Sequence, residues 1–242
     1  MQHNLEPIAM IGMACELANG IDGPQSYWNV LKNCIDVGSE IPKERFDVDS
    51  YASMFNFNKP FIRRGYFLND NQLNNFDPSF FGITDGEAMI MDPCHRLLLK
   101  KFFHLIEDAN YTSDQIRGSR TAVYIGQFTN DHAVTVHRTK IEDHTLMGPN
   151  ISLYNASSRL SYFYDLLGPN LTLDKACSSS LQATHLAIQS LRNGEVDLAV
   201  AGAANLNYTP ETFFIASFTG AISPDGRSRS YSEDANGYAK GK

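Results

Sequence analysis

Cys177 stands where a fold presents a nucleophile, at the end of one strand and the start of a helix. The apolar and β-branched residues 171–173 predict the strand, and the spacing of apolar residues from about Ser178 predicts a helix that stops at 192–194. Backbone N–H groups in the first turn of a helix have no intrahelical partner and favour an anion, which stabilises a thiolate. The same groups can bind the oxyanion that forms when the sulfur attacks a thioester carbonyl.

This segment has a second interpretation. A cysteine is often a small, buried hydrophobic residue without a chemical role, and Cys177 alone does not exclude that. Lys175 shares a face with Cys177 only if the strand continues through both positions, in which case its ammonium would stabilise the thiolate. The surrounding sequence is therefore needed to decide between a nucleophile and a structural residue.

The residues around Cys177 resemble the active-site elbow of the β-ketoacyl synthases, most closely the ketosynthase domains of polyketide synthases and animal-type fatty acid synthases. The resemblance covers nearly the whole chain, although Lys175 replaces the threonine that is usual in the family. Six matches follow the family order: the opening strand Ile8–Met13, the Asp-Pro-x-Phe-Phe-Gly-Ile signature Asp77–Ile83, the helix Met91–Leu99, the elbow Ala176–Leu181, and the loops Ser223–Arg227 and Asp234–Tyr238. Six ordered matches are more specific than any single motif.

The resemblance implies an α/β protein with the thiolase-like fold, of which residues 1–242 form only the N-terminal half. We expect them to be one β-ketoacyl synthase N-terminal domain, incomplete at its C-terminus. The resemblance makes Cys177 the catalytic residue, which takes an acyl group from a phosphopantetheine thioester. A malonyl-type extender on an acyl carrier protein then loses carbon dioxide and attacks that acyl group. Two histidines of the family's second half serve this step, so we expect the isolated chain to be inactive.

The order of predicted elements also indicates an α/β architecture. A continuous apolar run at 8–14 predicts a strand buried on both faces, and 121–126 and 197–204 predict two more. Ser26 is expected to cap a helix. A longer helix is predicted over 85–109, disturbed at a proline. Together these elements predict a mixed sheet with flanking helices.

A long aromatic-rich insertion separates the first elements from the rest. Residues 36–84 lose regular periodicity among prolines and asparagines. We predict an ordered insertion rather than a linker, because its phenylalanine rings need burial. These rings are Phe46, Phe55, Phe57, Phe67, Phe76, Phe80 and Phe81.

Composition excludes several classes of protein. The net charge of -7 argues against nucleic acid or anionic membranes as partners, and no apolar run reaches membrane length. Four cysteines without paired or metal-type spacing predict a reducing compartment, so we expect a cytoplasmic protein with no bound metal or cofactor. The expected partners, from the resemblance, are an acyl carrier protein, acyl-thioesters, and a second copy or a full ketosynthase.

The histidines offer no clear alternative site. His132, His137 and His144 form a loose cluster, but structural zinc sites usually have tighter paired spacing. His185 lies two turns along the elbow helix, about 12 Å of rise from Cys177, and is expected to serve core or surface packing. His95 is expected on a helix surface. The acidic and basic residues Asp225, Arg227 and Asp234 are treated as loop-forming rather than catalytic.

Three functional hypotheses follow from the sequence. The first is part of a polyketide synthase-type ketosynthase, whose family performs acyl transfer and decarboxylative condensation. The second is a non-catalytic partner that pairs with a full-length ketosynthase through the dimerisation surface. The third is a simple cysteine acyltransferase or thioesterase that uses only the elbow around Cys177. Acylation of Cys177 separates the second hypothesis from the other two.

Overall fold

The computed structural model describes residues 6–54, 62–139, 145–207 and 209–241. The chain divides into two compact units. The sheet unit consists of Met1–Ala14 and Phe76–Asn205, and the second unit consists of Cys15–Asn75 and Leu206–Lys242. Within the described ranges, no helix is long and apolar enough to cross a membrane.

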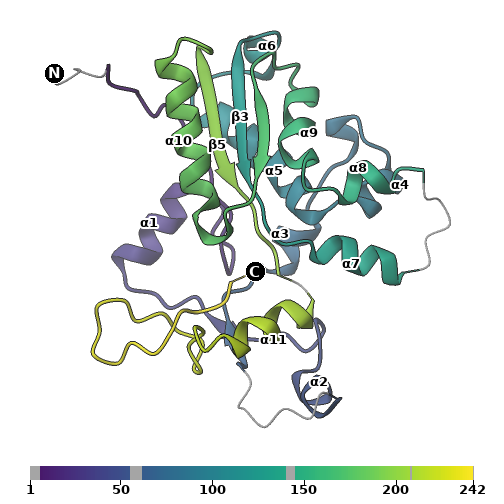
Figure 1. Cartoon of the computed structure of the whole chain (residues 1–242), viewed down its shortest axis with the longest axis vertical. Helices are drawn as coiled ribbons and strands as arrows, with labels where there is room; N and C mark the ends of the chain where they lie inside the picture. Colours follow the sequence, from purple (N-terminus) through teal and green to yellow (C-terminus); the bar gives the residue numbers. More distant parts are fainter. Residues whose placement is uncertain (1–5, 55–61, 140–144, 208, 242) are drawn as a thin grey trace. The chain divides into compact units, whose positions relative to one another are not determined.

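The sheet unit is built on three parallel strands in the order β4-β3-β5 (Figure 1). The strands are β3 (Thr121–Gly126), β4 (Asn170–Leu173) and β5 (Leu198–Ala203), which confirms all three strands predicted in this region. Gly126 pairs with Leu173 on one side and with Ala203 on the other. The expected mixed sheet is not found among the described residues, because their one antiparallel pair of strands forms a separate sheet in the second unit.

Alternate residues of β3 face two different helix layers, so its whole length is buried. Ala122 and Tyr124 pack with Ala183 and Ala187 of α10 (Ser179–Arg192). Val123 and Ile125 belong to a larger core with α5 (Pro93–Asp108) and α9 (Asn155–Phe163). Figure 1 shows α10 on one side of the strands, with α5 and α9 on the other. The helix predicted after Cys177 is therefore confirmed, and it covers one face of the sheet.

The predicted helix over 85–109 is confirmed as two helices. They are α4 (Asp85–Ile90) and α5, and the break occurs where Asp92 caps α5 just before Pro93. The remaining helical elements of the sheet unit are η1 (Ser79–Phe81), α6 (Ser113–Ile116), α7 (Asp131–Arg138), α8 (Met147–Ile151) and η2 (Ala176–Ser178).

The prediction of a buried strand at 8–14 is wrong. These residues pair with no strand among the described residues, and Met10 is 78% exposed. A strand requires a partner for its backbone hydrogen bonds, whereas here the N–H of Met13 donates to Asp108 Oδ2 at 2.7 Å. Gly12 lies against the last turn of α5, where an added Cβ would come within 2.8 Å of the Leu105 oxygen. The apolar run therefore packs beside a helix end.

The second unit contains α1 (Pro24–Lys32), α2 (Val48–Met54), α3 (Asp70–Asn74) and α11 (Pro210–Phe218), with the antiparallel strands β1 (Ser39–Glu40) and β2 (Arg64–Gly65). Its core packs Phe213 of α11 against Phe46 and Phe67, with ring centroids 5.7 Å and 5.9 Å apart. Helix α1 was predicted to start at a Ser26 cap. It starts earlier, at Pro24, because proline suits the first helical position, and the Ser26 hydroxyl bonds back to Gly23.

The described residues of the aromatic insertion are ordered, as predicted. Phe67 and Phe81 are buried, and Phe76 stacks on Phe81 with centroids 5.2 Å apart. Phe80 is 52% exposed, so its predicted burial is wrong; its edge contacts Phe81 and Phe103 while much of the ring faces solvent. Phe55 and Phe57 lie outside the described residues.

Candidate active site

Cys177 lies in a single 3-10 turn, η2, that joins β4 to α10. Its neighbour Ala176 has a φ angle of 49°, a left-handed conformation that costs a residue with a Cβ about 1–2 kcal/mol. The Asp174 carboxylate holds this conformation by accepting the N–H of Ala176 at 2.9 Å. The chain therefore reverses sharply at the elbow and leaves Cys177 exposed to solvent as a free thiol.

Ser179 locks the elbow from the inside. Its buried hydroxyl accepts the N–H of Lys175 at 2.8 Å and donates to the carbonyl oxygen of Ala176 at 2.7 Å. Gly126, the last residue of β3, lies so close that an added Cβ would be 2.6 Å from Ser179 Cβ. A side chain at 126 would push α10 away from the sheet. The turn that carries Cys177 is thus fixed by the end of the central strand.

Lys175 does not share a strand face with Cys177. Strand β4 ends at Leu173, and both Lys175 and Cys177 are exposed in the turn that follows. Lys175 would face the thiol only if the strand continued through both positions, and it does not. His185 is exposed on α10, in agreement with a packing or surface role.

The histidine cluster does not assemble as a metal site in the described part of the chain. No group of three histidine, cysteine, aspartate or glutamate side chains is placed there to hold a metal ion. His132 is buried, and its Nε2 lies within hydrogen-bond distance of the Ile90 carbonyl oxygen, while His137 is exposed in the last turn of α7. His144 lies outside the described residues.

Sequence reasoning missed a buried polar group next to the elbow. Gln127 directly follows Gly126 and is 1% exposed; its backbone N–H donates to the Leu173 oxygen at 3.1 Å. Its side-chain Nε2 donates to Asp92 Oδ2 at 3.0 Å, and Asp92 Oδ1 accepts the N–H of Cys94 at 2.8 Å. A local pattern could have singled out each residue by itself, because Asp92 precedes the proline that starts a helix and Gln127 lies at the carboxyl end of a parallel strand, but neither pattern predicts the bond between them.

His95 was expected on the helix surface, and that prediction is wrong. It is 1% exposed on the buried face of α5, and neither ring nitrogen has a hydrogen-bond partner among the described residues. The pKa of His95 is lowered to about 4, mainly by burial; the nearby Asp92 opposes this shift, and Arg159 and His132 add to it. His95 therefore stays neutral near pH 7.

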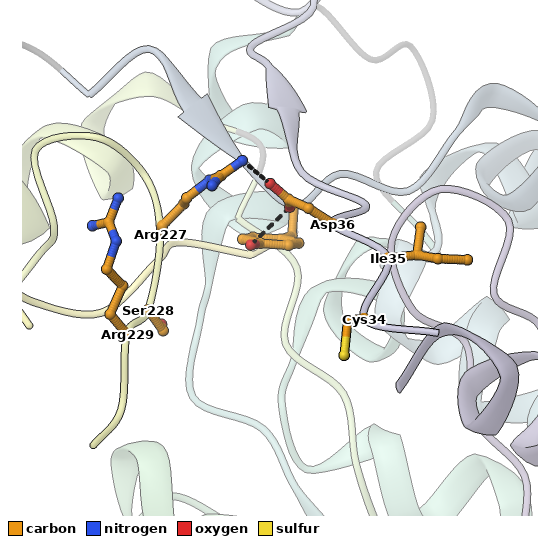
Figure 2. Close-up of a pocket in the computed structure, with 7 residues that line it drawn as sticks. Cys34, Ile35, Asp36, Arg227, Ser228 and Arg229 are labelled. Carbon is orange, nitrogen blue, oxygen red and sulfur yellow. Dashed lines mark hydrogen bonds and ion pairs between the residues drawn. The ribbon is translucent and has the colours of Figure 1, made fainter. Parts of the chain in front are cut away.

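The second unit contains a pocket that is open to solvent and has an ion pair along one side. Figure 2 shows Arg227 pointing at Asp36, with Cys34 and Ile35 on the opposite wall. Asp36 also accepts a hydrogen bond from the Tyr66 hydroxyl at 3.1 Å. These contacts tie the loop after 223 to the segment after α1, which agrees with the loop-forming role expected for Arg227. We assign no ligand to this pocket.

Comparisons with known proteins identify the family of the chain. Residues 5–242 match the family model described as the β-ketoacyl synthase N-terminal domain. The chain is 43% identical to the polyketide synthase component of compactin nonaketide synthase from Penicillium citrinum, over 98% of this chain and 8% of that protein. It therefore spans less than a tenth of that relative.

Solved structures support the fold. The ketosynthase from module 6 of the bacillaene synthase of Bacillus subtilis 168 matches with a TM-score of 0.82 and 33% identity, over 96% of this chain and 38% of that one. An oxazolomycin ketosynthase domain from Streptomyces albus JA3453 matches with a TM-score of 0.81 and 31% identity, over 95% and 40%. The thiolase-like fold expected from the resemblance is confirmed. The chain belongs to the β-ketoacyl synthase family and matches the N-terminal domain of its polyketide synthase-type ketosynthases.

Proposed function

We propose that this chain supplies the acyl-accepting cysteine of a polyketide synthase-type ketosynthase. The observation that carries the proposal is the elbow, where Cys177 is an exposed free thiol in a turn fixed by Asp174 and Ser179. The Cys177 sulfur attacks the carbonyl carbon of an acyl-thioester carried on the phosphopantetheine arm of an acyl carrier protein. A new carbon–sulfur bond forms, the old one breaks, and the phosphopantetheine thiol leaves with a proton.

The turn prepares that step in two ways. The start of α10 lies directly after Cys177, so the positive end of the helix dipole favours the negative charge that develops on the carbonyl oxygen during the attack. The bonds that Ser179 makes within the turn limit its motion, which keeps the sulfur in one orientation. We further propose that condensation with a malonyl-type extender uses the two histidines of the second half of the family fold.

The experiment is acyl loading followed by intact-mass spectrometry. The chain is incubated with a short acyl N-acetylcysteamine thioester, and the mass increase of one acyl group is measured over time. Cys177→Ala is expected to abolish the increase, whereas the control Cys34→Ala, which removes another exposed cysteine, is expected to retain it. Loading that persists in Cys177→Ala would refute the assignment.

The remaining hypotheses give different results in the same assay. A simple acyltransferase or thioesterase would release free acid or a new ester while the acyl group on Cys177 turned over. A non-catalytic partner would show no loading. The second outcome is supported by two exposed leucines of the sheet unit, Leu181 of α10, which is 72% exposed, and Leu171 of β4. We place acyl transfer first because an interaction surface alone requires no exposed thiol at the elbow.

A further inference from the structure

Gln127 connects the elbow to a buried carboxylate on the far side of β3. The backbone N–H of Gln127 donates to the Leu173 oxygen, on the last residue of β4 before the elbow starts. The next residue, Asp174, holds the left-handed turn at Ala176 that precedes Cys177. Four consecutive residues, 173–176, therefore connect the backbone bond of Gln127 to Cys177.

The Gln127 side chain is fixed by Asp92, which is 2% exposed. The Asp92 carboxylate accepts one bond from Gln127 Nε2 and one from the first turn of α5, while its own N–H donates to the Asn150 oxygen at 2.9 Å. Asn150 is in turn held by Arg159, whose guanidinium donates to Asn150 Oδ1 at 2.8 Å. A buried hydrogen bond to a charged acceptor has a narrow geometry, so this anchor tolerates little displacement.

The geometry points to Gln127 as a positioning residue for Cys177, with Asp92 as its anchor. This inference rests on the proposed function, since it assigns Gln127 to the orientation of the proposed acyl acceptor. Gln127 touches no reacting atom. It acts by holding the ends of β3 and β4 in register where the elbow begins, while Gly126 holds the start of α10.

The test compares thiol reactivity in the full chain with no acyl-thioester present. Iodoacetamide alkylates exposed thiols, and peptide mass spectrometry gives the rate at Cys177 divided by the rate at Cys34 in the same sample. Thermal unfolding is recorded in parallel. We expect Gln127→Leu to lower the ratio about tenfold, because a displacement of the turn moves the sulfur away from the positive end of the α10 dipole. Asp92→Ala, which removes both acceptor oxygens, should lower the ratio in the same direction.

A reversed pair provides the rescue. In the double variant Asp92→Asn with Gln127→Glu, the asparagine amide donates to the new carboxylate and its oxygen still accepts the N–H of Cys94. We expect this variant to return the ratio to within about twofold of the original. A purely structural role would lower the melting temperature and leave the ratio unchanged.

The inference is overturned if Gln127→Leu, or Asp92→Ala where Gln127→Leu does not fold, leaves the ratio unchanged. It is also overturned if the reversed pair melts like the original chain but keeps a low ratio. Because alkylation requires no acyl transfer, a chain that fails acyl loading yet shows these ratios would refute the proposed function and leave this inference intact.

Discussion

Replacing Gly126 by alanine should destabilise the sheet unit at the elbow itself. The new Cβ would lie 2.6 Å from Ser179 Cβ, 2.9 Å from the Ser179 carbonyl carbon and 3.1 Å from the Ser180 nitrogen. Two of these atoms are backbone, so no side-chain rotation can relieve the overlap. Overpacking of this kind typically costs about 1–3 kcal/mol. The strand end and α10 have to separate, and the turn at Cys177 moves with them.

Gly202→Ala on the neighbouring strand is the matched control. Gly202 pairs with Ile125, one position before Gly126, and its added Cβ would meet only Ile125 Cδ1 at 3.4 Å, an ordinary contact. Both substitutions lower the conformational entropy of the unfolded chain to the same extent, which by itself stabilises the folded state by about 0.4–1 kcal/mol. That contribution cancels in the difference, so the two variants should differ by the overlap alone, about 1–3 kcal/mol in free energy of unfolding.

Urea unfolding followed by circular dichroism measures both variants, with linear extrapolation to water. We expect Gly126→Ala to be less stable than Gly202→Ala and to load acyl groups more slowly on Cys177. Equal stability within about 0.5 kcal/mol would refute the reasoning, because it would mean that Ser179 does not pack against Gly126 as described.

Three further predictions concern groups away from the elbow. The pKa of His95 is lowered to about 4, so between pH 6.5 and 4 the unfolded state binds a proton at this residue and the folded state does not. The free energy of unfolding should therefore fall by up to roughly 3 kcal/mol as the pH drops from 6.5 to 4. His95→Gln should remove that part of the pH dependence of urea unfolding, and an unchanged profile would contradict it. Arg159→Met breaks a mostly buried ion pair with Glu87 and should lower the free energy of unfolding by about 3 kcal/mol. The control Arg117→Met breaks an exposed ion pair with Asp114 and should lower it by less than about 0.5 kcal/mol. In the second unit Phe213→Ala should cost about 3–5 kcal/mol, and the exposed Ile215→Ala on the same helix less than about 1 kcal/mol; similar losses would argue against the ring cluster.

Local pattern was enough to predict the elements that hold the site. Three elements occur as predicted: the strand at 121–126, the short strand before Cys177 and the helix after it. Each could be predicted because its own residues show the hydrophobic pattern of a strand or helix and a signal for where it ends. Local pattern also placed Cys177 between that strand and that helix, whereas its role as a nucleophile came from the resemblance and the geometry of the turn was not predicted. No periodicity shows that Ala176 adopts a left-handed φ or that Ser179 turns inward to bond the backbone.

The failures concern features that depend on partners distant in sequence. Residues 8–14 have the composition of a buried strand, yet a strand is defined by its neighbour, and these residues lie against the end of α5 instead. His95 was placed on a surface although it shares a helical stripe with Leu99, Phe102 and Ile106, which are all buried. The bond between Asp92 and Gln127 joins positions 35 residues apart, which no local pattern encodes.

The central claim is that the folded elbow, and not merely a free thiol, makes Cys177 an acyl acceptor. The most direct measurement is the rate of acyl loading at Cys177 relative to Cys34, in the folded chain and again in concentrated urea, with each site resolved by peptide mass spectrometry. The account predicts loading strongly in favour of Cys177 in the folded chain and a loss of that preference on unfolding. Equal loading of the two thiols in the folded chain would contradict it.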